Sequence, residues 1–306
     1  MTLRQLTEPV EDEVVAMVKL KWARLAPYVF ISPFFVIFLV FGAFPILFSG
    51  AVSLMDWKGV TLGQFVGLRN YLNLLRDPDF VRAVLNTLYL LVLSAPLTIG
   101  GGLVLAVLLN SQLLRLRGTF RTIFYLPMAV SLVVGGLAFA MLLNKPFGLV
   151  NDVILRQIFN LEPIDFLTNP RVAIPTLTLL IIWRYIGNDL VIMLAGLQSI
   201  SPELYEASRI DGASPFQTFI HITLPLMVPI ILFDAILTTV NTFNMFAEPY
   251  ILFGTEGGVD QAGLTTGLLI YRVSFKFFKF GYGAAMAYLL GVVIFALSLL
   301  QLRIGQ

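Results

Sequence analysis

Residues 201–226 read SPELYEASRIDGASPFQTFIHITLPL, and they are the polar segment with the most specific pattern in a largely apolar chain. Ser201 followed by Pro202 is typical of a helix start, because serine caps the first turn and proline suits it. Gly212 fits the left-handed position that ends a helix, and a second Ser-Pro pair follows it. The segment therefore predicts two short helices that meet at a corner, just before a long apolar run.

Composition defines the class of protein. Hydrophobic residues make up 58% of the 306 residues and charged residues 12%, about half the usual charged share. The charges lie in short clusters between apolar runs, so we expect an all-α membrane protein without a separate soluble core. A net charge of +2 indicates no nucleic-acid partner. The chain has no cysteine and one histidine, which excludes disulfides, thiolate metal sites and a His-based metal cluster.

Six apolar runs are each long enough to cross a lipid bilayer as a helix of about 20 residues. They are expected at residues 25–55, 83–114, 122–144, 172–199, 222–247 and 280–302. Residues 1–24 are polar and lack the apolar core of a signal peptide, so we expect a cytoplasmic tail followed by a membrane domain at 25–306. Six spans place both termini on one side, and the three Arg within 110–121 favour the cytoplasmic side.

A family resemblance appears at the corner segment. The matching residues are Glu206-Ala207-Ser208, then Gly212, then Ile222-Thr223-Leu224-Pro225 after a gap of nine residues. This arrangement resembles the EAA loop of permease subunits of binding-protein-dependent ABC importers, with Ser208 where a second alanine is usual. The similarity covers nearly the whole chain from residue 25, in the carbohydrate-uptake branch that resembles maltose and glycerol-phosphate permeases. It implies six transmembrane helices in the type I ABC importer permease fold.

The resemblance also implies partners. The loop at 200–224 would be cytoplasmic and would dock into a groove on an ATPase subunit. The expected contact residues are Glu206, Ala207, Ser208, Asp211 and Gly212. The expected complex contains a second permease subunit, which the resemblance favours as a different chain, two ABC ATPases and an extracytoplasmic solute-binding protein. It would lie in a bacterial or archaeal cytoplasmic (inner) membrane. The alternative for the loop is an amphipathic connector on the membrane surface.

ATP chemistry is not expected in this chain. None of its lysines follows a glycine as the Walker A motif requires, and no HExxH motif is present. We therefore expect no catalytic residue, cofactor or metal here, with ATP and Mg bound by the partner ATPases.

Three ionisable residues lie inside the predicted spans: Arg184, Asp189 and Asp234. Each costs roughly 2.5 to 3.5 kcal/mol at membrane depth on insertion scales, so it should face a cavity or a partner. Arg184 and Asp189 are five residues apart and point about 140° away from each other on a helix. We therefore expect Arg184 to form a structural interhelical pair with Asp234.

Polar side chains recur on one face of the fourth span and one face of the fifth. The predicted substrate path consists of Tyr185, Asn188, Asp189, Asn241, Thr242 and Met245. Carboxylate and amide groups hydrogen-bond hydroxyls, and an aromatic ring stacks on a sugar ring, so a sugar or polyol is the expected cargo. The alternative is that these residues only join helices.

Two other functions stay open. An ion-coupled secondary transporter would use Asp189 or Asp234, although the last three spans do not obviously repeat the first three. A membrane enzyme would use the two as a carboxylate pair.

The last loop has its own pattern. Five glycines between 254 and 267 predict an irregular segment, and apolar residues at helical spacing follow. Arg272, Lys276 and Lys279 form a neighbouring basic stripe. We expect these side chains to reach lipid headgroups or to receive an external binding protein.

Overall fold

The computed structural model describes residues 25–59, 63–111 and 116–305, and these are almost entirely helical. The strands within these ranges are the short antiparallel pair β1 (Met55–Asp56) and β2 (Gln64–Phe65), with Met55 opposite Phe65. The predicted all-α membrane fold is confirmed, whereas the expected tail at 1–24 lies outside the described residues.

The chain divides into two compact units, residues 1–52 and 53–306. The described part of the first unit belongs to one apolar helix, Leu25–Ser53, which contains the π-helical turn η1 (Leu39–Ala43) followed by α2 (Phe44–Ser53). Nearly all of its large apolar side chains are exposed. Its length and apolar composition suit a membrane span.

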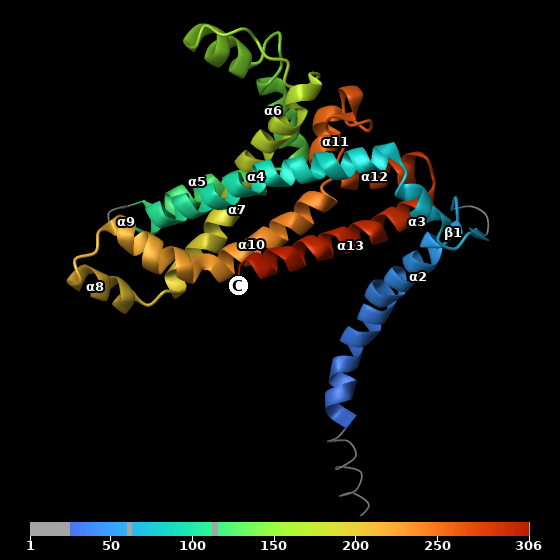
Figure 1. Ribbon diagram of the computed structural model, residues 1–306, viewed down its shortest axis with the longest axis horizontal. Helices are drawn as coiled ribbons and strands as arrows, with labels where there is room; N and C mark the ends of the chain where they lie inside the picture. The colour runs from blue at the N-terminus through green and yellow to red at the C-terminus, as the bar shows by residue number, and fades with distance from the viewer. Residues whose placement is uncertain (1–24, 60–62, 112–115, 306) are drawn as a thin grey trace, which may run out of the picture. The chain divides into compact units, whose positions relative to one another are not determined.

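In the described ranges, four more helices are long and apolar enough to cross a membrane. They are α4 (Pro78–Asn110), α7 (Ala173–Ser199), the helix Pro215–Asn244, and α13 (Phe280–Ile304). The helix Pro215–Asn244 consists of α9 (Pro215–Thr218), the π-helical η4 (Phe219–Thr223) and α10 (Leu224–Asn244). In Figure 1, α10 lies alongside both α4 and α13.

The predicted third span, 122–144, is not one straight helix. It consists of α5 (Arg117–Ala129) and α6 (Leu132–Leu142), which are bent by 95° relative to each other. Val130 and Ser131 between them have extended backbone angles, with ψ of 141° and 129°. The apolar pattern continues across this break, so composition alone does not reveal it.

The helices α4 and α7 approach closely at Gly102. A Cβ at this position would lie 2.8 Å from Asp189 Cβ and 2.9 Å from the backbone nitrogen of Leu190. Only a residue without a side chain allows this spacing. Around the contact, Ile99 and Leu103 pack with Leu190 in a buried apolar cluster.

Short elements connect the spans. They are α3 (Arg69–Leu74), η2 (Val150–Ile158), η3 (Pro170–Val172), α8 (Pro202–Ile210), α11 (Ala247–Phe253), η5 (Val259–Gln261), α12 (Thr266–Tyr271) and η6 (Arg272–Lys276). The segment from α11 to η6 is tied to the rest by buried hydroxyls. Thr266 Oγ1 donates to the Phe243 carbonyl at 2.6 Å, and Thr265 Oγ1 donates to the Met245 carbonyl at 2.7 Å. As the glycine pattern predicts, Gly254, Gly257 and Gly258 have positive φ.

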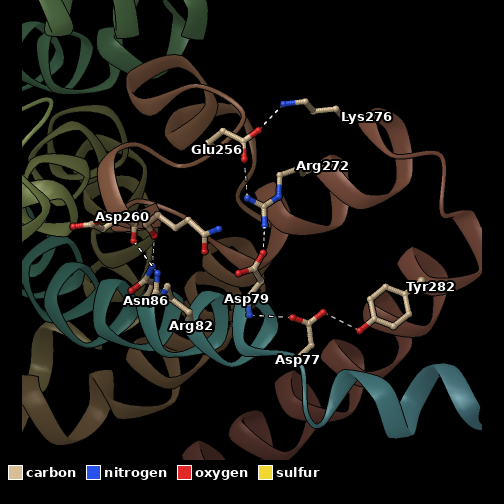
Figure 2. Close-up of polar contacts among 10 residues, drawn as sticks. Asp77, Asp79, Arg82, Asn86, Glu256, Asp260, Arg272, Lys276 and Tyr282 are labelled. Carbon is tan, nitrogen blue, oxygen red and sulfur yellow. Dashed lines mark hydrogen bonds and ion pairs between the residues drawn. The ribbon is translucent and has the colours of Figure 1, made fainter.

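A polar network fixes this last loop to the start of α4 (Figure 2). Arg272 is buried, and its guanidinium lies 2.6 Å from Asp79 Oδ2 and 3.2 Å from Glu256 Oε2. Lys276 Nζ lies 2.5 Å from Glu256 Oε1. The expectation that Arg272 reaches headgroups or an external partner is therefore wrong, because its charge is used inside the protein.

Candidate functional site

The corner segment forms two capped helices, as predicted. Ser201 Oγ accepts a hydrogen bond from the Glu203 backbone N–H at the start of α8. At α9, Ser214 Oγ accepts from the Gln217 N–H at 3.3 Å, while Gln217 Oε1 accepts from the Ser214 N–H at 2.8 Å. Gly212 has φ of +75°, the left-handed conformation that ends α8. The backbone therefore makes the sharp corner that the sequence indicates.

The five candidate coupling residues are not equivalent. Glu206, Ala207, Asp211 and Gly212 are exposed. Ser208 is buried. Its Oγ donates to the Tyr205 carbonyl at 2.9 Å and lies 3.2 Å from Thr218 Oγ1 in α9. Four residues thus present a surface, while Ser208 holds the two short helices together.

A cavity of about 570 Å³ lies among α4, α5, α6, α7, α10 and α11. All six residues predicted for the substrate path line it: Tyr185, Asn188, Asp189, Asn241, Thr242 and Met245. Apolar side chains complete the wall, among them Ile181 and Phe246. The cavity therefore combines hydrogen-bonding groups with apolar and aromatic surface.

The predicted pair between Arg184 and Asp234 is not formed. Arg184 Nη1 instead donates to the carbonyls of Pro127 and Val130, at 3.3 and 3.0 Å. Those carbonyls lie at the bend between α5 and α6, where the helical hydrogen-bond ladder is interrupted. Asp234 lines the cavity, so the two charges have separate surroundings.

Glu248 was missed from the sequence. It is buried in α11, lines the cavity, and its Oε1 accepts a hydrogen bond from Tyr185 Oη at 2.5 Å. Its position directly after the predicted fifth span made it look like a loop residue. The available signal was a lone carboxylate between apolar residues and Pro249, at the end of a polar helical stripe.

Within the described ranges, no group of three or more His, Cys, Asp or Glu side chains could hold a metal ion.

Comparison with known proteins decides the family. The model of the family described as "Binding-protein-dependent transport system inner membrane component" matches residues 98–306. The chain belongs to this family. The permease is thus a multi-pass membrane subunit of an ABC importer, and the resemblance seen at the EAA-like loop is confirmed. This is a family of transport subunits, so an enzyme or an ion-coupled transporter is not favoured.

Relatives that align over most of their length are also permease proteins of transport systems. The lactose transport system permease protein LacF of Rhizobium radiobacter is 36% identical over 90% of the permease and 92% of its own length. The arabinooligosaccharides transport system permease protein AraP of Bacillus subtilis (strain 168) is 34% identical over 92% and 89%. A solved chain of a bacterial alginate ABC transporter, in complex with an alginate pentasaccharide-bound periplasmic protein, is 25% identical with a TM-score of 0.76. The structural match covers 92% of the permease and 95% of the alginate transporter chain.

Proposed function

We propose that the permease imports a sugar or a related polyol through the cavity between α7 and α10. The observation that carries this proposal is that the six residues expected to contact cargo all line one cavity of about 570 Å³. That volume lies within the usual range for small-molecule sites.

The chemistry of the wall supports a saccharide. Asn188, Asn241 and Thr242 provide donors and acceptors for hydroxyl groups. Tyr185, Met245 and Phe246 provide aromatic and apolar surface for the C–H faces of a sugar ring. Two relatives carry lactose and arabinooligosaccharides in their names, which supports the same class of cargo.

The exposed side of the corner supports an ATPase contact. Glu206, Ala207, Asp211 and Gly212 present backbone and carboxylates at a capped corner, with Ser208 packed behind them. We assign this surface to docking on an ATPase that binds ATP and Mg. Nucleotide-driven movement of the ATPases would then change which side of the membrane the cavity opens to.

The proposed complex has two permease subunits, two ATPases and an extracytoplasmic binding protein. A different second permease is the expected partner. With six spans, the termini and the corner would lie together on the cytoplasmic side, with residues 1–24 as a tail and 25–306 as the membrane domain. A periplasmic partner in the related alginate transporter supports the external binding protein.

Uptake into proteoliposomes tests the cargo path. Lactose and an arabinooligosaccharide, each with its binding protein, are the first probes. Asp189→Asn and Asn241→Ala should each weaken uptake about tenfold or change the order of preferred sugars. Val240→Ala, at a neighbouring residue that is not part of the cavity wall, should transport normally. Unchanged affinity and range in both cavity variants would remove these residues from the path.

Co-purification tests the ATPase contact. A tagged permease should bring down an ATPase, and Glu206→Arg should reduce its recovery severalfold. Glu162→Arg, an exposed carboxylate elsewhere in the chain, is the matched control and should leave recovery unchanged. Equal ATPase recovery with the wild type, Glu206→Arg and Glu162→Arg would mean that the docking surface lies elsewhere.

A further inference from the structure

Three carboxylates line the cavity that we propose as the cargo path. Asp189, Asp234 and Glu248 are 4%, 2% and 5% exposed. Among the described residues that line the cavity, none is Lys, Arg or His. The cavity lining supplied by this chain is therefore acidic, with no basic side chain among the described residues in it.

The three carboxylates differ in how their oxygens are satisfied. Glu248 accepts the short hydrogen bond from Tyr185, and Asp189 Oδ1 has a long contact of 3.5 Å with Asn188 Nδ2. Asp234 Oδ2 is buried, and no group in the described parts of the chain donates a hydrogen bond to it. An unpartnered oxygen of this kind is costly in a protein interior, so it marks a place where a ligand donor can bind.

Arg184 lies behind this wall, with its guanidinium carbon 5.7 Å from the centre of the Tyr185 ring. It directly precedes Tyr185 in α7, but its Nη1 donates to the carbonyls of Pro127 and Val130. It is also absent from the cavity lining.

We propose that Asp189, Asp234 and Glu248 select cargo by charge, favouring a sugar that bears an ammonium group and opposing one that bears a carboxylate, sulfate or phosphate. The inference rests on the proposed function, since it assumes that this cavity is the path. An ammonium group offers three donors, and one of them satisfies Asp234 Oδ2 with a charge-assisted hydrogen bond. An anionic group meets three carboxylates beside protein walls of lower dielectric constant than water, where Coulomb repulsion is stronger than in bulk water.

The absence of cysteine from the chain allows a direct test. Thr238 lines the cavity one helical turn from Asp234, so Thr238→Cys places a single reactive thiol of this chain beside the carboxylates. Two thiol reagents of similar size are compared on the intact detergent-solubilised complex at low salt. They are a trimethylammonium-ethyl and a sulfonatoethyl methanethiosulfonate. Leu161→Cys, exposed and outside the cavity, gives the intrinsic ratio of the two rates.

The expected result is a ratio of cationic to anionic rates about tenfold higher in Thr238→Cys than in Leu161→Cys. Adding Asp189→Asn and Asp234→Asn to the Thr238→Cys variant should bring the ratio to within about threefold of the control, and Glu248→Gln should lower it independently. Recovery of the assembled complex shows whether each variant has folded. Equal ratios at the two thiols, or a ratio that the three neutral substitutions leave unchanged, would overturn the charge selection.

Protection of the thiol in the Thr238→Cys variant by added sugars tests whether cargo charge affects binding in the cavity. Glucosamine should slow its modification by a neutral methanethiosulfonate more than glucose at equal concentration, and glucuronate should slow it least. Equal protection by all three sugars would reject the charge selection and still support a sugar path. Protection by none of them, with the charge ratio as expected, would instead count against the proposed cargo class.

Discussion

Arg272 Nη2 lies 2.6 Å from Asp79 Oδ2, and this ion pair joins two residues that are 193 positions apart in the chain. The same guanidinium contacts Glu256, which in turn contacts Lys276 (Figure 2). Arg82 and Asn86 add hydrogen bonds from α4 to the carbonyls of Asp260 and Gln261. The loop between α11 and α13 is thus fixed to α4 by charge as well as by packing.

The first prediction concerns the stability of this network. Asp79→Asn combined with Glu256→Gln leaves the buried Arg272 without a carboxylate and should cost about 3 kcal/mol. Each single substitution should cost about 1 to 2 kcal/mol, because one partner remains. The apparent unfolding temperature of the purified complex measures the loss. Asp152→Asn, in the exposed pair with Arg156, is the control and should cost less than about 0.5 kcal/mol. A double variant as stable as this control would contradict the prediction.

The second prediction concerns pH. The hydrogen bond from Lys276, together with the charges of Lys276 and Arg272, lowers the pKa of Glu256 from its ordinary 4.5. A lowered folded-state pKa means that the stability from Glu256 is fully present above pH 4.5 and is lost as the pH falls through the lowered value. The unfolding temperature of the wild type should therefore exceed that of Glu256→Gln by a constant amount above about pH 5 and converge with it at lower pH. In a Lys276→Met background the folded-state pKa of Glu256 is lowered less, so the same comparison should complete its convergence at a higher pH. Parallel curves at all pH values would refute the role of Glu256.

The third prediction concerns the contact between α4 and α7. Gly102→Ala forces a Cβ against Asp189 Cβ and the Leu190 backbone, so the helices must separate and Asp189 must move. We expect a loss of about 1 to 3 kcal/mol and weaker sugar uptake. Gly100→Ala on the same helix meets no atom within 4 Å and should be neutral or slightly stabilising. Equal uptake and unfolding temperatures in the two variants would show that the close approach is not needed.

The fourth prediction concerns Gly212. Its φ of +75° allows glycine without strain, and a Cβ there would meet no atom within 4 Å in this chain. Within this chain, the cost of substitution is therefore conformational, about 1 to 2 kcal/mol for most side chains. Gly212→Val should reduce both ATPase recovery and uptake, whereas Gly212→Asn should retain most of both, because asparagine tolerates this conformation. Normal transport by the valine variant would remove Gly212 from the coupling mechanism.

The fifth prediction tests the surroundings of Arg184. Because Arg184 bonds to carbonyls at the α5–α6 bend, Arg184→Met should lower the unfolding temperature. Exchanging the charges as Arg184→Asp with Asp234→Arg should not restore stability. A wild-type unfolding temperature in the exchanged variant would instead support the interhelical pair expected from the sequence.

Local patterns predicted much of the fold. Apolar length located the spans, and the Ser201 and Ser214 caps with Gly212 located both short helices, because these signals act within a few residues. Helical periodicity likewise grouped Asp189 and Asn241 on faces that meet at the cavity.

Contacts between distant segments were not predictable in this way. The partners of Arg184 depend on a bend that hydropathy does not encode, and the burial of Arg272 depends on Asp79, far away in the sequence. The burial of Ser208 likewise depends on Thr218 in the next helix, whose Oγ1 lies 3.2 Å from Ser208 Oγ, while its role at the ATPase contact stays a prediction. Pairings of this kind arise from tertiary packing.

The ion pair between Asp79 and Arg272 has a consequence for biogenesis. At synthesis rates of roughly 5 to 20 residues per second, the ribosome reaches residue 272 about 10 to 40 seconds after residue 79. During that interval Asp79 at the start of α4 lacks its partner Arg272, however much of the nascent chain is already in the membrane. Closure of the network therefore requires that translation has passed residue 272, and chains truncated before this residue leave Asp79 without its cation.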